Sequence, residues 1–107
     1  MATSKQYLAF IMDQLASLDD VSYRAMMGEY VLYYRGKIFG GLYDDRLLIK
    51  PVDAALTLLP NAPLEKPYEG AKPMVLVEDV DDSSFLAMLV DAMAGELPPP
   101  KQKKKAT

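Results

Sequence analysis

The chain has 107 residues, 50% of them hydrophobic and 25% charged, which is the composition of one ordinary folded domain and excludes a disordered or fibrous chain. It has no Cys and no His, which removes disulfides, thiolate metal sites, the usual catalytic triads and the histidine zinc motifs. The N-terminal residues lack the pattern of a signal peptide, and no apolar run approaches the ~20 residues of a membrane span. We therefore expect a cytoplasmic protein that makes no membrane contact.

The charge is unevenly distributed along the chain. The net charge is −3, but the last twelve residues hold four Lys and one Glu, which leaves 8 basic and 14 acidic residues, a net of −6, over residues 1–95. Affinity for a phosphate backbone comes mainly from cations that release counterions. We therefore expect no nucleic-acid binding by this body, and at most a weak, salt-sensitive contact through Lys101–Lys105.

The first half of the chain predicts a helix followed by an antiparallel meander. Ser4–Leu18 has the apolar spacing of an amphipathic helix, with Thr3 or Ser4 as its N-cap. From Val21 to Lys50 the pattern changes to four short β-rich runs, VSYRAM, EYVLYYR, KIFGGLY and RLLIK. Two-residue turn candidates separate these runs, at Gly28, Arg35–Gly36 and Asp44–Asp45.

The second half predicts a short helix over Val52–Leu59, a strand over Met74–Glu78 and a last helix that Asp82 or Ser83 caps and Gly95 closes. The intervening segment 60–73 holds four of the eight prolines and should be irregular, with a short strand near Tyr68 as an option.

These elements predict an α+β, two-layer sandwich. Its antiparallel sheet consists of a four-strand meander plus one or two later strands, with the helices on one face. We expect one domain over residues 1–95 and a disordered Pro/Lys-rich tail over residues 96–107.

The stretch from Arg24 to Lys50 resembles the N-terminal domain family of TfoX (Sxy), the competence regulator. The resemblance rests on Arg24, Met26-Met27-Gly28, Tyr30, Gly36-Lys37-Ile38-Phe39-Gly40, and Leu47 with Lys50, and extends over about residues 4–95. Met27 stands where the family pattern has an aromatic residue. The resemblance implies a small non-enzymatic module without a cofactor, which acts through protein–protein contact in transcriptional or competence regulation.

Three charged residues are the strongest candidates for a site. The family pattern places Arg24 and Lys50 on neighbouring sheet elements, where they could hold an anionic ligand or a partner. The alternative is structural: an ion pair with Glu29, or a Lys stem that covers apolar surface. Tyr30 and Tyr34 could add aromatic contact surface, although core packing is the usual role of such side chains.

The sequence predicts no catalytic or metal-binding residues. The carboxylate pairs at Asp19–Asp20, Asp44–Asp45 and Asp81–Asp82 fall at predicted turns and caps, where local backbone bonding explains them. Gly40 and Gly41, inside a strand, indicate a bulge or a helix that crosses tightly over the strand, or else a ligand that approaches the backbone. The rival to a binding module is therefore an enzyme or ligand-binding protein that holds an anionic small molecule near Arg24 and Lys50. A concave pocket at these two residues would favour that rival, whereas a flat sheet with exposed aromatics would favour the module.

Alternation along the strands raises the question of a dimer. Side chains alternate along a strand, so Tyr30, Leu32 and Tyr34 point to one face of the sheet, and Val31 and Tyr33 point to the other. Helices on one face bury only one apolar set. We expect the second set to be covered in a homodimer through the sheet, or else by the Pro-rich 60–73 loop of the same chain.

Overall fold

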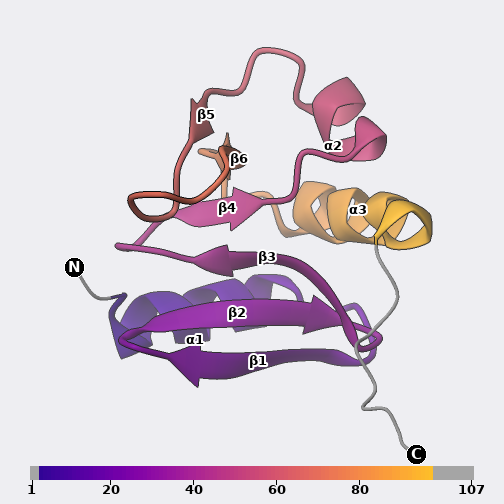
Figure 1. Cartoon of the computed structure of the whole chain (residues 1–107). Helices are drawn as coiled ribbons and strands as arrows, with labels where there is room; N and C mark the ends of the chain where they lie inside the picture. The colour runs from indigo at the N-terminus through magenta and orange to yellow at the C-terminus, as the bar shows by residue number, and fades with distance from the viewer. Residues whose placement is uncertain (1–2, 98–107) are drawn as a thin grey trace, which may run out of the picture.

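The structure of the protein is a computed structural model that describes residues 3–97 (Figure 1). It contains three α-helices, six strands and a short 3₁₀ helix. In chain order these are α1 (Lys5–Gln14), β1 (Val21–Met26), β2 (Glu29–Tyr34), β3 (Lys37–Leu42), β4 (Leu47–Ile49), α2 (Asp53–Leu58), β5 (Leu64–Glu65), β6 (Met74–Val77), α3 (Ser83–Met93) and η1 (Ala94–Glu96). Within residues 3–97, no helix has the length and apolar character needed to cross a membrane.

All six strands form one antiparallel sheet in the order β1-β2-β3-β4-β6-β5, which confirms the expected sheet and the α+β class. Three two-residue turns join the first four strands, at Met27–Gly28, Arg35–Gly36 and Asp44–Asp45. Both central residues of each turn have positive φ, between 53° and 88°. Turns of this kind match the right-handed twist of a hairpin, so the meander is built from local geometry.

Several element boundaries differ from the sequence expectations. The Ser4 hydroxyl accepts a hydrogen bond from the Tyr7 N–H, which confirms Ser4 as the cap of α1, but the helix ends at Gln14 rather than Leu18. The short strand of the Pro-rich segment is Leu64–Glu65 and does not include Tyr68, because β6 pairs with that earlier stretch. Gly95 does not close α3 in a left-handed cap, since the chain continues through it into η1.

The core joins the three helices to alternate positions of the sheet. Its strand residues include Leu32 of β2, Leu47 of β4 and Val75 of β6, which the strand register places on one face. The helices contribute apolar side chains such as Ile11 and Leu89 to the same cluster. We call this the core face of the sheet and the opposite one the outer face.

The folded part extends past the expected boundary at residue 95. Leu97 is 5% exposed and belongs to the core cluster. The carboxylate of Glu96 accepts a hydrogen bond from the N–H of Ala54, at the start of α2. The rest of the predicted tail, residues 98–107, lies outside the described residues.

Gly40 sits where β3 approaches the backbone of β4 most closely. A β-carbon at this position would lie 2.2 Å from the backbone oxygen of Leu48 and 2.8 Å from the Cα of Ile49. The β2–β3 register also shifts between Leu32 and Tyr33. The expected irregularity of the strand is therefore confirmed, whereas the alternative of a helix crossing is wrong for Gly40, because the backbone that approaches it is that of strand β4.

We expect Gly40→Ala to lower the free energy of unfolding by about 2–3 kcal/mol, because backbone atoms cannot move away from the added methyl group as a side chain could. Urea unfolding measures this change. Gly95→Ala is the matched control, since no heavy atom lies within 4 Å of the position its β-carbon would take. Equal losses for the two variants would contradict the assignment.

Candidate functional site

The outer face is partly covered by the chain itself. One row of paired residues crosses it from β1 to β6, through Arg24, Val31, Gly41, Leu48 and Leu76. Leu48, in the middle of this row, is fully buried although it lies outside the core cluster. The apolar set that suggested a face-to-face dimer is therefore largely covered within one chain.

Tyr43 provides part of this cover. A β-carbon at Gly41 would lie 2.6 Å from the Tyr43 ring and 2.8 Å from its hydroxyl oxygen, so the ring occupies space that only glycine leaves free. The Tyr43 side chain is 8% exposed, and this burial raises the pKa of its hydroxyl, with smaller contributions from Tyr68 and Glu29. Each of the two glycines therefore leaves room for a neighbour: Gly40 for the backbone of β4, and Gly41 for the ring of Tyr43.

The Pro-rich segment provides the rest of the cover. The ring of Tyr68 lies 6.3 Å from that of Tyr43, between ring centroids. Arg46 holds this arrangement in place: its Nε donates to the backbone oxygen of Tyr43 at 3.0 Å, and its guanidinium forms an ion pair with Glu65 of β5. The segment that begins with β5 is therefore tied to the β3–β4 turn.

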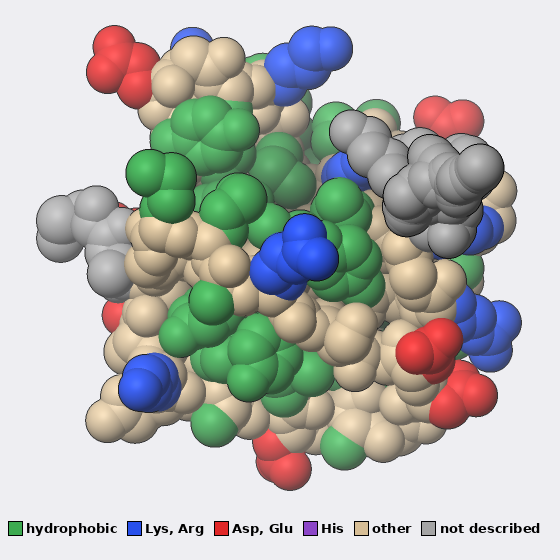
Figure 2. Space-filling view, turned by 60° about the horizontal axis from the view of Figure 1, so that its bottom comes forward, with side chains coloured by type: hydrophobic (Ala, Val, Ile, Leu, Met, Phe, Trp, Pro, Cys, Tyr) green, Lys and Arg blue, Asp and Glu red, His purple; other side chains and the backbone are tan. Residues whose placement is uncertain are grey.

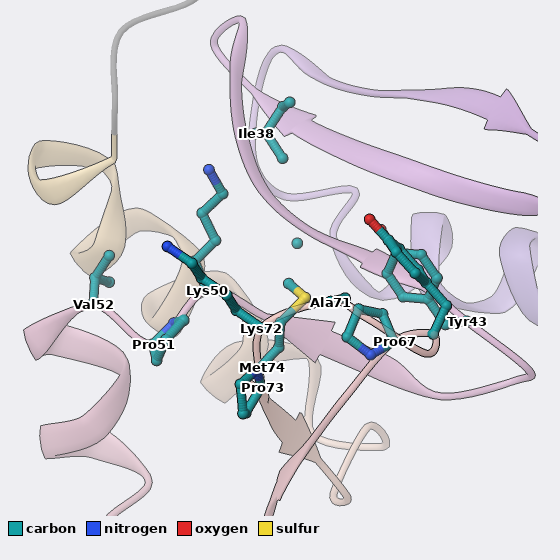
Figure 3. Close-up of a pocket in the computed structure, with 12 residues that line it drawn as sticks. Ile38, Tyr43, Lys50, Pro51, Val52, Pro67, Ala71, Lys72, Pro73 and Met74 are labelled. Carbon is teal, nitrogen blue, oxygen red and sulfur yellow. The ribbon is translucent and has the colours of Figure 1, made fainter.

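Between the segment and the sheet lies an open groove of about 490 Å³. Figure 3 shows Lys50 and Lys72 between Pro51 and Val52 at one end and Tyr43 with Pro67 at the other. The lining residues are mostly apolar, namely Ile38, Gly40, Tyr43, Lys50, Pro51, Val52, Pro67, Tyr68, Ala71, Lys72, Pro73 and Met74.

The charge of the groove is opposite to that of the body. Its lining carries two Lys and no carboxylate, whereas residues 1–97 carry 8 basic and 15 acidic residues, a net of −7. Figure 2, turned so that the β1 side comes forward, shows hydrophobic side chains and a basic one over the middle of the visible face, with both acidic and basic side chains around its rim. The groove, an apolar concave surface that carries two amino groups, concentrates negative ligands locally, despite the overall charge.

The structure separates two of the predicted site residues. Arg24 lies on β1 and Lys50 directly follows β4, so β2 and β3 stand between them. Three strand spacings amount to about 14 Å. The expectation that these residues occupy neighbouring elements, which came from the family pattern, is wrong, because the strands of the meander pair in chain order and this order separates the first strand from the fourth. Lys50 lines the groove and Arg24 does not.

The carboxylate of Glu29 is bound by Thr3 and Asp44 rather than by Arg24. It accepts hydrogen bonds from the Thr3 hydroxyl at 2.8 Å and from the Asp44 N–H at 3.1 Å. Within residues 3–97 it forms no ion pair with Arg24. Glu29 thus stabilises the Asp44–Asp45 turn, whose two non-glycine residues have positive φ.

The two predicted tyrosines belong to the core face. Tyr30 packs edge-on against Tyr23, with ring centroids 5.7 Å apart. Tyr34 is 1% exposed, and its hydroxyl donates to the Asp91 carboxylate of α3 at 2.9 Å. Neither residue lines the groove. Both support the sheet on which the groove is built.

Tyr34 also makes the free energy of unfolding depend on pH in the alkaline range. Burial raises its pKa, and the hydrogen bond to Asp91 raises it further, whereas an unfolded tyrosine ionises near pH 10. Above that pH the unfolded chain gives up its proton first, so the free energy of unfolding falls as pH rises toward the pKa of the folded state. Below pH 10 both states keep the proton and the contribution is constant.

We expect Tyr34→Phe to lower stability by about 1 kcal/mol at neutral pH, through the lost hydrogen bond, and to make the decline above pH 10 less steep. Urea unfolding across this range measures both effects. An unaltered slope in Tyr34→Phe would contradict the contribution assigned to this hydroxyl.

The groove could not be predicted from the sequence, because its walls come from distant segments. Tyr43 follows β3, whereas Tyr68 and Lys72 lie 25 and 29 residues further along the chain, between β5 and β6, and no periodic pattern joins the two segments. One signal was available: a Gly-Gly pair in a strand, two residues before a tyrosine, followed later by a Pro-rich segment with its own tyrosine. It favours an aromatic ring packed on a strand.

The chain is similar in sequence to one protein family and to one relative within the curated proteins. The family model of the TfoX N-terminal domain matches residues 13–94. An uncharacterized 12.7 kDa protein from the trpE 5' region of Spirochaeta aurantia is 38% identical over 108 residues, which cover 100% of this chain and 94% of that protein. No solved structure matches the chain significantly.

Proposed function

The chain belongs to the TfoX N-terminal domain family, and we propose that it is a small non-enzymatic regulatory module that binds an extended, acidic peptide segment of a partner protein in the groove. The proposed module acts in transcriptional or competence regulation. The observation that carries the proposal is the pairing of Lys50 and Lys72 with an otherwise apolar and aromatic lining.

Three properties of the groove favour a peptide. It is open to solvent rather than enclosed, which leaves room for a segment that continues beyond the contact. Tyr43 and Tyr68 offer the large aromatic surfaces that dominate binding energy at protein interfaces. The two amino groups favour carboxylate side chains between the apolar contacts, and they disfavour basic segments by a like-charge penalty.

A small anionic molecule is the second candidate, because the groove volume lies in the usual range of small-molecule sites. If the ligand is a small anion, its negative group pairs with Lys50 and Lys72, because Arg24 lies three strands away from Lys50. The aromatic and proline residues would then enclose the apolar part of the ligand.

Selection from a random-peptide library on the immobilised protein tests the proposal. The selected peptides should be enriched in Asp or Glu next to apolar residues, and Lys72→Glu should weaken their binding about tenfold, the value of one charge-assisted hydrogen bond. Tyr68→Ala should also weaken binding. Lys5→Glu, the same charge change at an exposed site on α1, is the matched control and should bind as the wild type does.

Two outcomes would overturn the peptide assignment. One is a selection with no acidic preference, or one that Lys72→Glu and Lys5→Glu weaken equally. The other is binding of inorganic phosphate or acetate that shifts the NMR signals of the groove residues while no peptide is selected, which would support the small-anion candidate instead.

A further inference from the structure

The two edges of the sheet are protected very differently. β5 has two residues, Pro63 and Pro67 flank it, and Glu65 is ion-paired, all of which hinder the addition of another strand. The other edge, β1, has six residues without Pro or Lys, and all but Val21 are exposed. No described element lies on its outer side (Figure 1). Proteins usually block an open edge of this length unless another strand pairs with it.

The hydrogen-bond pattern identifies the free backbone groups of β1. In a hairpin with a two-residue turn, the two residues that flank the turn form a hydrogen-bonded pair, here Met26 and Glu29. Hydrogen-bonded and non-hydrogen-bonded pairs then alternate along the strands, so Arg24 and Ser22 are also hydrogen-bonded to β2. The Arg35 N–H donates to the Asp20 oxygen at 2.9 Å, as this alternation requires. The even-numbered residues of β1 therefore face β2. The N–H and C=O groups of Val21, Tyr23 and Ala25 point outward, and within residues 3–97 no hydrogen bond reaches them.

We propose that a second copy of this chain pairs with β1 in an antiparallel ladder centred on Tyr23, so that the protein is a two-fold dimer with a continuous twelve-stranded sheet. In this register Tyr23 pairs with the partner's Tyr23, and Val21 pairs with the partner's Ala25. All outward groups on both strands are then satisfied, in six backbone hydrogen bonds.

Like-charge repulsion excludes one neighbouring register of β1, and incomplete hydrogen bonding excludes the other. A ladder centred on Arg24 would place two guanidinium groups directly opposite, with Cα atoms about 4.5 Å apart, and like charges in that position are destabilising. A ladder centred on Ser22 would leave the outward groups of Ala25 unpaired. Only the Tyr23 register places Arg24 opposite a neutral residue, Ser22, and uses every outward group of the strand.

The side chains on the core-face side agree with this register. Tyr23 already packs edge-on against Tyr30 of its own chain, and half of its side chain is exposed. Across the two-fold axis the two Tyr23 side chains lie on the same face, with Cα atoms about 5.5 Å apart. They continue the aromatic contact into the partner, a pairing that contributes up to about 1 kcal/mol beyond the backbone bonds.

The two-fold axis of such a ladder is perpendicular to the sheet. Both outer faces then point the same way, and the two grooves open on the same side of the dimer. A partner protein with two acidic segments could occupy both at once, which raises its apparent affinity without any new contact. The dimer itself does not depend on the peptide function, because it uses no groove residue.

A charge-swap experiment tests both the dimer and its register. We expect the wild-type chain to approach twice the 11.9 kDa mass of the monomer by sedimentation or light scattering as its concentration rises to the high micromolar range. Tyr23→Lys alone and Tyr23→Glu alone should be monomeric, because each places like charges opposite each other across the axis. An equimolar mixture of the two variants should form a mixed dimer.

Met27→Lys is the matched control. Met27 is 98% exposed in the β1–β2 turn, beyond the proposed ladder, so this charge change should leave the dimer intact. Thermal unfolding of each variant checks that the monomer is folded. A monomeric wild type would overturn the proposal, as would Tyr23 variants that dimerise like the wild type. A mixture that fails to associate would overturn the register, even if each variant alone is monomeric.

Discussion

Strand β3 carries two consecutive positions, Gly40 and Gly41, at which any β-carbon would collide with neighbouring atoms: the backbone of β4 at Gly40, and the Tyr43 ring at Gly41. Gly40 allows the β4 backbone to come close, which aligns Leu47 and Ile49 with the helices of the core. Gly41 allows Tyr43 to lie on the strand. Because β3 is an inner strand, both layers of the molecule depend on this pair.

The same constraint connects the core to the proposed binding surface. Tyr43 lies on Gly41, Tyr68 lies near Tyr43, and the Arg46–Glu65 ion pair keeps the Pro-rich segment within reach of both. These contacts hold the two aromatic rings of the groove in place in the absence of a ligand. Preformed surfaces lose less conformational entropy on binding.

The sequence predicted those parts of the fold that follow from local periodicity and turn chemistry. The four meander strands, the turns at Arg35–Gly36 and Asp44–Asp45, and the Ser4 cap were all readable because each depends on residues close together in the chain. The separation of Arg24 from Lys50 follows from the predicted meander, whose first and fourth strands are not neighbours, although the family pattern suggested that the two residues lie on adjacent elements. The groove depends on a contact between Tyr43 and Tyr68, which no repeating pattern records.

The N-terminus is attached to the far end of the meander by a small set of bonds. Thr3 donates to Glu29 and accepts from the Asp45 N–H at 3.2 Å, and the Ser4 N–H donates to the Asp45 carboxylate at 2.8 Å. These bonds join residues 26 to 42 positions apart in the chain. The first residues to be synthesised therefore obtain these partners only after the β3–β4 turn exists. Formation of non-local contacts is slow, because the loop must be closed first. The Ser4 cap of α1 is local and can form early, but the bonds from Thr3 and Ser4 to Asp45 have to wait for the three hairpins of the meander, so the attachment of α1 to the sheet is among the last parts of the fold to be fixed in place.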